Sequence, residues 1–309
     1  MTLALRFHSG NLLKSITWIT PVLLSSLVLG CTSSTGNRSE TIAPPPFVFR
    51  KLELEQKKAG GDADWKLSSP EARYELSRRL VKAKNPIGVL YSKNKPSFKI
   101  RADFAIVVND GQQIILEGDV QLQQVNGLKV LIKGERLRWQ PELSRLAMEQ
   151  QPRAFDDQSR ITATFAVLQI DTNDLTLKGP VQLDRWNKEL AFTAKPDTAV
   201  RTGKTLWNLE SGSLKANGPV LGQRRDQEGV VLEQLEGREL IGNTQKGVIT
   251  VKSPVIVTMP RNKGLLRAKD TRWNIRQQTL SSNDPFQGLI NETQINGERF
   301  LAELDQSAL

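Results

Sequence analysis

Apolar and polar residues alternate along most of the chain from residue 98 onward. The clearest apolar positions are Ile100, Ala102, Phe104, Ile106 and Val108, then Leu116, Val120 and Leu122, then Leu128, Val130 and Ile132. A period of two is typical of β-strands that bury one face and expose the other. The pairs Asn126–Gly127 and Asn296–Gly297 favour the tight turns of β-hairpins. The pattern therefore predicts an all-β, antiparallel body over residues 47–309.

One stretch, residues 69–84, permits two interpretations. Ser69 followed by Pro70 is typical of a helix start, with serine as the cap and proline in the first turn. Apolar residues at Ala72, Tyr74 and Leu76 instead alternate as they do in a strand. We expect a strand here.

Three tryptophans mark an internal repeat. They are Trp139, Trp207 and Trp273, which lie 68 and 66 positions apart. A leucine follows each tryptophan seven positions later, at Leu146, Leu214 and Leu280. The segments LEGDVQL from Leu116 and LKGPVQL from Leu177 precede the first two. A recurrence at about 67 residues is typical of units that stack on one another and share a continuous core. The alternative interpretation is chance recurrence of a common hairpin.

The first residues have the parts of a secretory signal. Residues 1–15 carry Arg6 and Lys14 and no acid, and an apolar run of 14 residues, 16–29, leads to Gly30 and Cys31. Such a run is too short to span a bilayer, which needs about 20 apolar residues. The stretch 27–31 resembles a lipobox, which implies cleavage after Gly30 and a lipid on Cys31. The alternative is a plain signal peptide with a chance cysteine.

These features divide the chain into three parts. Residues 1–30 are the expected lipoprotein signal peptide and residues 31–46 a lipidated, flexible tether that ends in three prolines. Residues 47–309 are the repeated β-body. A lipid on Cys31 would anchor the body to a membrane, outside the cytoplasm.

Composition narrows the possible chemistry. Cys31 is the only cysteine and His8, in the segment expected to be removed, the only histidine, so the mature chain would lack histidine. This excludes Ser-His-Asp and Cys-His catalysis and His-ligated zinc. We therefore expect no enzyme, no cofactor and no metal. Only carboxylate chemistry on glycans stays open, with Asp156–Asp157 or Glu117 and Asp119 as candidate acids.

Charge points to anionic partners. The formal net charge is +10, and loss of Arg6 and Lys14 leaves 41 basic and 33 acidic residues, a net charge of +8. Such a surface attracts nucleic acid, anionic lipid or acidic polysaccharide. An exported protein rarely meets nucleic acid, so lipid or polysaccharide is favoured. The complete Gly-x-x-x-x-Gly-Lys-Ser/Thr nucleotide-binding loop does not occur in the sequence, so we expect any ATP-driven step to belong to a partner.

Several motifs resemble the LptC/LptA (OstA-like) family of lipopolysaccharide transport proteins. Residues 61–67 (GDADWKL) followed by Ala72-Arg73-Tyr74 are similar to the first strand of the family, and Leu-x-Gly-x-Val-x-Leu at 116–122 and 177–183 to a later one. The resemblance covers roughly residues 47–300. It implies an elongated, twisted, open β-jellyroll built here from stacked antiparallel repeats. A lipobox in place of a spanning helix, and a longer body, depart from well-known members.

The resemblance also implies partners. Family members bind the acyl chains of lipopolysaccharide, receive the molecule from an inner-membrane ABC transporter (LptB, LptF and LptG) and pass it to an LptA-like bridge protein. Accordingly, residues 65–76 would face the transporter and residues 286–303 a periplasmic partner. We expect a periplasmic location, with the inner membrane favoured over the outer. Thr32 beside the anchor leaves the target membrane open.

Candidate site residues follow from this expectation. The apolar trough for acyl chains would contain Ile114, Leu116, Val120, Leu122, Leu177, Val181 and Leu183. Headgroup contacts would come from Lys129, Lys133, Arg136 and Arg138. The alternatives are an ordinary packed core and a solvated basic face. A structural or protein-binding outer-membrane lipoprotein therefore remains a competing function.

Overall fold

The alternating runs form strands. The structure is a computed structural model that describes residues 47–58, 60–186 and 195–304. The expected signal peptide, Cys31 and the tether lie outside the described residues. Within the described part the chain contains no α-helix, and its strands are all β-sheet elements of the unit 43–309.

The N-terminal half contains β1 (Phe47–Lys57), β2 (Ala63–Glu75), β3 (Leu80–Lys84), β4 (Ile87–Ser92), β5 (Lys95–Arg101), β6 (Phe104–Val108), β7 (Gln113–Gln124), β8 (Leu131–Gln140), β9 (Arg145–Met148), β10 (Arg153–Phe155), β11 (Ser159–Thr162), β12 (Phe165–Gln169), β13 (Asp174–Lys178) and β14 (Val181–Arg185). Short 3₁₀ turns are η1 (Leu76–Arg78), η2 (Asn109–Gly111) and η3 (Pro141–Leu143).

The C-terminal half contains β15 (Thr198–Thr202), β16 (Thr205–Asn208), β17 (Ser213–Arg225), β18 (Val231–Asn243), β19 (Val248–Val251), β20 (Val255–Met259), η4 (Pro260–Asn262), β21 (Gly264–Ala268), β22 (Thr271–Asn274), β23 (Thr279–Ser282), β24 (Phe286–Ile290), β25 (Thr293–Gly297) and β26 (Phe300–Glu303).

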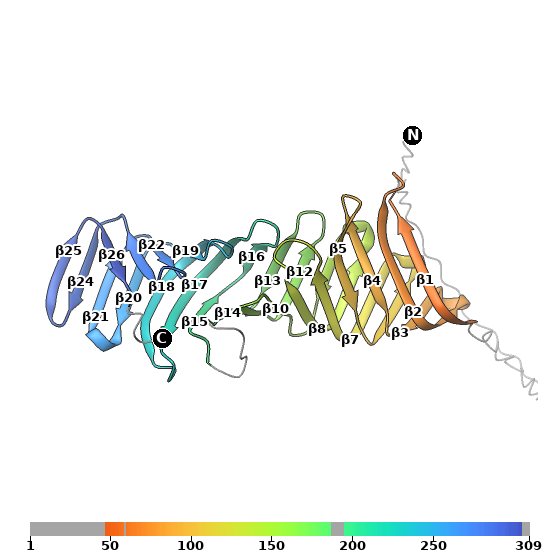
Figure 1. Cartoon of the computed structure of the whole chain (residues 1–309), viewed down its shortest axis with the longest axis horizontal. Coiled ribbons are helices and arrows are strands. Elements are labelled where there is room, and N and C mark those ends of the chain that lie inside the picture. The colour runs from red at the N-terminus through yellow and green to blue at the C-terminus, as the bar shows by residue number, and fades with distance from the viewer. Residues whose placement is uncertain (1–46, 59, 187–194, 305–309) are drawn as a thin grey trace, which may run out of the picture. The chain divides into compact units, whose positions relative to one another are not determined.

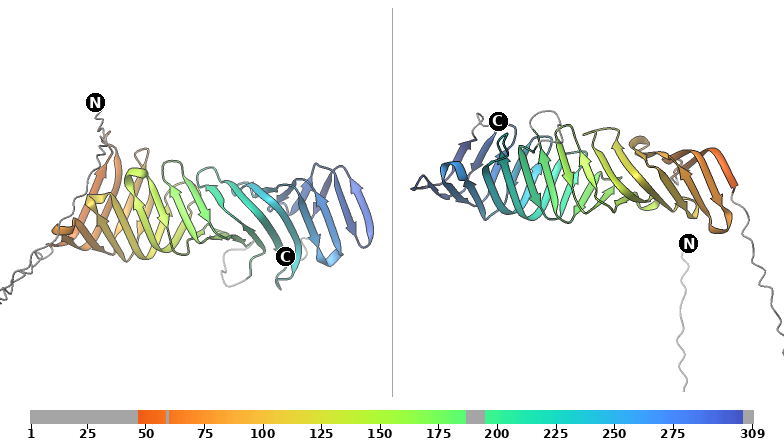
Figure 2. Two further views of the ribbon diagram at one scale, coloured as in Figure 1. Left: turned by 180° about the vertical axis from the view of Figure 1, so that it is seen from behind. Right: turned by 90° about the horizontal axis from the view of Figure 1, so that it is seen from below.

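The strands follow one another along one axis, from β1 at one end to β24 and β25 at the other (Figure 1). The same succession is seen from behind and from below in Figure 2. All pairings are antiparallel and belong to one continuous hydrogen-bonded sheet. This is the all-β, extended jellyroll that the sequence predicts.

The sheet folds into two layers that face each other. Layer A contains β3, β6, β9, β12, β13, β16, β19, β22, β23 and β26; layer B contains β4, β5, β10, β11, β14, β15, β20, β21, β24 and β25. The long strands β7, β8, β17 and β18 pass through both layers. Side chains from the two inner faces meet directly: the Trp65 and Trp139 rings lie 5.3 Å apart, edge to face.

The strand β7 shows how the chain crosses between layers. Its residues Gln113–Glu117 pair with β6, whereas the residues from Gln121 onward pair with β5. The register shifts between Glu117 and Val120, where Gly118 has a φ of 75°. A Cβ at Gly118 would lie 2.4 Å from a carboxylate oxygen of Asp103. Only glycine fits this bend, because it needs both the positive φ and the space.

The second Leu-x-Gly-x-Val-x-Leu motif was expected to form one continuous strand, and this was wrong. Residues 177–183 belong to two strands, β13 and β14, which are separated by Gly179 and Pro180. Gly179 has a φ of 88°, and β13 pairs in layer A while β14 pairs in layer B. Alternation of apolar residues persists across the bend, so the sequence pattern did not reveal it. The motif marks the passage between layers.

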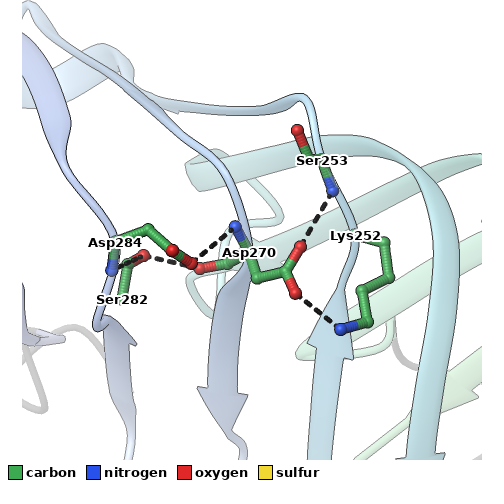
Figure 3. Close-up of polar contacts among 5 residues, drawn as sticks. All are labelled: Lys252, Ser253, Asp270, Ser282 and Asp284. Carbon is green, nitrogen blue, oxygen red and sulfur yellow. Dashed lines mark hydrogen bonds and ion pairs between the residues drawn. The ribbon is translucent and has the colours of Figure 1, made fainter.

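Polar contacts join neighbouring bends. The amide of Asp103 donates to the carbonyl of Gly118 (2.9 Å), and the Thr164 hydroxyl donates to the carbonyl of Lys178 (2.9 Å). Farther along, Lys252 Nζ lies 2.5 Å from a carboxylate oxygen of Asp270, whose other oxygen accepts from the Ser253 amide at 3.2 Å (Figure 3). Hydrogen bonds and ion pairs therefore link neighbouring bends along one edge of the two layers.

The tryptophan repeat is a repeated hairpin. Each tryptophan pairs directly with the leucine seven positions later: Trp139 with Leu146, Trp207 with Leu214, and Trp273 with Leu280. All six side chains are buried.

The strand expected over residues 69–84 is also confirmed, since β2 and β3 cover this stretch and are separated by η1 and Arg79. Ser69 caps no helix; its hydroxyl donates to the carbonyl of Lys84 at 2.7 Å.

Replacing the glycine at a bend should destabilise the body. In Gly179→Ala the backbone would hold a left-handed φ, which costs about 1–2 kcal/mol, and the new Cβ would lie 1.9 Å from the Thr164 hydroxyl. We expect the melting temperature to fall by at least several degrees, at about 2–4 °C per kcal/mol. Gly60→Ala is the matched control, because nothing lies within 4 Å of its Cβ position. Equal melting temperatures for the two variants would contradict this account of the bend.

The Lys252–Asp270 pair should make stability depend on pH. The hydrogen bond from Lys252 lowers the pKa of Asp270 below its ordinary value. A lowered folded-state pKa stabilises the fold above the unfolded pKa of about 3.9, and this contribution is lost as pH falls through the folded value. Asp270→Asn should therefore lower the melting temperature at pH 6 and have little effect near pH 3. Glu298→Gln, at an exposed side chain, is the control across the same pH series.

Candidate functional site

The seven residues expected to line a trough all face the space between the layers. Ile114, Leu116, Val120, Leu122, Leu177 and Val181 are buried, and Leu183 is partly buried against the same core. They are packed closely: the cavities that Leu183 borders measure only about 30 and 20 Å³. The structure thus brings the seven residues together in one apolar interior. Contact of that interior with lipid stays a prediction.

The four basic residues expected to meet a headgroup do not act together. Arg138 lies 2.9 Å from Glu149, and Arg136 lies 3.4 Å from Glu117 and 3.8 Å from Glu149. These two arginines are already neutralised by carboxylates on neighbouring strands. Lys129 and Lys133 instead lie on the outer face of layer B, where they border a groove.

This groove has a volume of about 720 Å³ and crosses β8, β10 and β11. It is lined by Lys129, Leu131, Lys133, Arg153, Phe155, Asp156, Asp157, Arg160 and Thr162. Strand register explains the grouping. Arg153 lies between Lys133 and Thr162, and Phe155 lies between Leu131 and Arg160. A row with two cations, Lys133 and Arg153, therefore runs beside a row with two apolar side chains, Leu131 and Phe155, and Arg160. We call this surface the basic groove.

Charges in the basic groove are unevenly neutralised. Arg160 lies 2.7 Å from Asp184, and its guanidinium group lies 5.2 Å from the Trp186 ring centroid. Lys129, Lys133 and Arg153 form no ion pair with any described residue. Three cations are thus available to an anion, and Arg can bind phosphate or carboxylate with two parallel hydrogen bonds.

The acids of the groove belong to a turn. Asp156 accepts a hydrogen bond from the Gln158 amide at 2.9 Å, which fixes the β10–β11 turn. Asp156 and Asp157 are therefore consecutive turn residues. The second pair of candidate acids is also engaged, since Glu117 contacts Arg136 and Asp119 accepts from the Gln121 side chain at 2.8 Å. Asp156, Glu117 and Asp119 are thus each engaged by a neighbouring donor or cation.

The inner side of the same hairpin is apolar. Ala154 and Ile161 point inward, where they border the cavity of about 30 Å³ together with Trp207, Leu214 and Ile249 from layer A. Asp156 borders both this cavity and the basic groove. The β10–β11 turn is thus a rim, with an apolar interior on one side and a cationic surface on the other.

The facing rim comes from layer A. Asn243, Thr244 and Gly247, in the turn between β18 and β19, border the same cavity as Asp156. Arg185, at the end of β14 in layer B, borders the same cavity and donates to the Gln158 side chain of the β10–β11 turn at 2.6 Å. Burial lowers the pKa of its guanidinium group below the ordinary value. The arrangement suits a molecule with an apolar part for the interior and an anionic part for the outer groove.

Sequence reasoning missed Arg153, Phe155 and Arg160. Alternation within Arg153-Ala154-Phe155 and within Arg160-Ile161-Thr162 places these side chains on the outer face. If Asp156–Asp157 is taken as a hairpin turn, this alternation predicts that Arg153, Phe155 and Arg160 share one face. What the pattern did not supply was the pairing with β8, which adds Lys133 to the row.

Residues 22–183 match the family model LptC, described as lipopolysaccharide-assembly, LptC-related. The chain belongs to the LptC-related family. Its members are transport and binding proteins associated with the periplasmic side of the inner membrane, and membership implies involvement in lipopolysaccharide transport. The resemblance seen in the sequence motifs is thereby confirmed. No curated protein matches the chain.

The LptC-related region ends within β14 and so includes the whole basic groove. The hairpins of Trp207 and Trp273 lie beyond it. Among the described residues, no helix is long and apolar enough to cross a membrane.

Neutralising the basic groove should weaken binding of an anionic amphiphile. In Lys133→Gln/Arg153→Gln, the affinity for dodecyl phosphate should fall about ten-fold, which corresponds to about 1.4 kcal/mol. The effect should shrink as salt rises, because exposed charges are screened. Isothermal titration calorimetry at two salt concentrations measures both quantities.

The control is Arg136→Gln/Arg138→Gln, which removes the same charge from a surface where carboxylates already neutralise it. Equal losses of affinity in the two double variants would mean that net charge, and not the basic groove, binds the phosphate.

Proposed function

We propose that this LptC-related chain is a periplasmic lipid-binding component of lipopolysaccharide export. In this proposal it accepts lipopolysaccharide from an inner-membrane ABC transporter of the LptB, LptF and LptG type. It then passes the molecule along the apolar interior to an LptA-like bridge protein. A lipid on Cys31 would hold the body at the membrane.

The observation that carries the proposal is the two-sided β10–β11 hairpin. An amphiphile with several acyl chains and a phosphorylated sugar headgroup needs both an apolar interior and an anion-binding surface within one molecular length. Acyl chains would lie against Ile161 and Leu183, where apolar burial contributes about 25 cal/mol per Å². Phosphate would lie near Lys133 and Arg153, and sugar hydroxyls would donate to Asp157.

Loading requires the two layers to separate, because a cavity of about 30 Å³ holds no acyl chain. Among the residues that the structure describes, few polar contacts cross between the rims. The Gln124 side chain donates to the carbonyl of Leu209 at 3.3 Å, and Lys58 lies 3.6 Å from Asp171. The free energy needed to break such contacts is small compared with the free energy gained when acyl chains cover apolar area.

The ends of the body suit strand addition by partners. At the N-terminal end, β1 pairs only with β2 among the described strands, and Phe47, Val48 and Phe49 are exposed. At the C-terminal end, β25 and β26 each pair with one described strand, and Leu289 and Leu301 are exposed. Unpaired edges with apolar side chains are typical sites for a partner strand. Residues 65–76, expected to face the transporter, are not an edge, because β2 pairs with β1 on one side and with β3 and β4 on the other. The transporter would therefore dock at β1, and the bridge protein at β25 and β26.

One observation favours a second function. The close packing of the interior is also what a structural or protein-binding lipoprotein requires, since such a protein needs stable ends and no internal ligand. In that case β1 and β26 would still bind partners, and the interior would never contact lipid.

Photocrosslinking in living cells separates the two functions. A photoreactive amino acid at Leu183 or Val120 should yield adducts with lipopolysaccharide, and depletion of ATP should reduce them. Gln121, which faces outward on β7 between buried Val120 and Leu122, is the matched control and should stay unlabelled. A folded, membrane-bound protein that gives no adduct at either inward position would support the structural lipoprotein instead.

A further inference from the structure

The repeat tryptophans occupy one row inside the body. Strand pairing leads from Trp139 through Leu146, Leu168 and Leu175 to Trp207, which is four strands away. Four further strands lead from Trp207 to Trp273. Tyr74 lies four strands before Trp139 in the same row. With strands about 4.8 Å apart, successive aromatic side chains lie about 19 Å apart along the body.

The three tryptophans share an unusual property. Trp139, Trp207 and Trp273 are 1%, 2% and 3% exposed, and the indole nitrogen of each has no hydrogen-bond acceptor among the described residues. Trp65 differs, since its indole nitrogen donates to the Gln56 side chain at 3.1 Å. Buried indole N–H groups normally have an acceptor, because an unpaired donor in an apolar environment costs free energy.

Packing alone does not account for these donors. The Trp207 ring borders the interior cavity. Asp156, Ser159, Asn243 and Thr244 also border this cavity and carry acceptor oxygens, but none of them accepts a hydrogen bond from the Trp207 indole nitrogen. Phenylalanine or leucine would fill such a position without an unpaired donor. The acceptor would therefore come from a molecule that enters the interior. Such a molecule must be largely apolar and carry hydrogen-bond acceptor oxygens among its apolar groups.

We propose that the indole N–H groups of Trp139, Trp207 and Trp273 form a series of binding stations for the carbonyl oxygens of acyl chains. This rests on the proposed function, because it assumes that lipid enters the interior. Each station offers one hydrogen bond, which is enough to orient an acyl ester but too weak to trap it. A spacing of about 19 Å divides the path into equivalent steps.

The test uses two lipids that differ only in their carbonyl groups. Purified full-length protein is titrated with dimyristoyl phosphatidic acid and with its ditetradecyl ether analogue in the same detergent, by displacement of a fluorescent fatty acid. Wild-type protein should bind the ester lipid about five-fold more tightly, as expected for one hydrogen bond. Trp207→Phe should reduce this preference, and Trp139→Phe/Trp207→Phe/Trp273→Phe should abolish it.

Trp65→Phe is the matched control, since its indole donor already has a protein acceptor, and it should keep the full ester preference. A second variant guards against loss of packing: 3-benzothienylalanine at position 207 keeps the ring size and replaces the N–H group by sulfur. It should bind the ether lipid as wild type does and show a reduced ester preference.

The outcomes separate the two levels of the argument. If neither lipid binds to folded protein, the proposed lipid transport fails. If both bind equally to wild type, or the triple variant keeps the ester preference, lipid transport stands and the indole stations are wrong.

Discussion

Every repeat of this body has to pass between two facing layers without breaking the hydrogen-bonded sheet. At Gly118 and Gly179 the passage depends on a positive φ at a place where no Cβ fits. At Gly218, in the bend of β17, the constraint is space alone, since a Cβ there would lie 1.8 Å from the Arg238 carbonyl oxygen. Because the backbone stays paired on either side of the bend, apolar side chains can face inward in both layers. The shared core, the outer groove and the row of tryptophans all follow from this geometry.

The β10–β11 hairpin shows what two layers can do that one flat sheet cannot. Ala154 and Ile161 contribute to the interior, while Arg153 and Arg160, one residue away on each strand, contribute to the outer surface. Alternation within a strand therefore places apolar and cationic environments about one sheet thickness apart. Amphiphilic lipids have this same separation between their acyl chains and charged headgroups.

Much of the fold could be predicted from the sequence, because a period of two and Trp–Leu spacing both report local geometry. The spacing of Trp139, Trp207 and Trp273 predicted a repeat, whereas the direct pairing of each tryptophan with its leucine came from the structure. The bends could not be predicted, since Gly118 occupies an inward position of an unbroken alternating pattern. The sequence also did not reveal that the charges of Arg136 and Arg138 are neutralised. Their partners are Glu117 on β7 and Glu149, which directly follows β9. Alternation predicts which way a side chain points, but the partner across the sheet depends on register.

Because the strands stack along one axis, the length of the body can change independently of the structure of its ends. Each repeat, with four strands in each layer, contacts mainly the repeats before and after it. Its stability therefore depends on its neighbours and little on the total number of repeats. Insertion of one more Trp–Leu unit would lengthen the body by about 19 Å, four strand spacings, and leave both ends unchanged. The number of repeats therefore sets the length of the body, and it can change without altering the strands at either end.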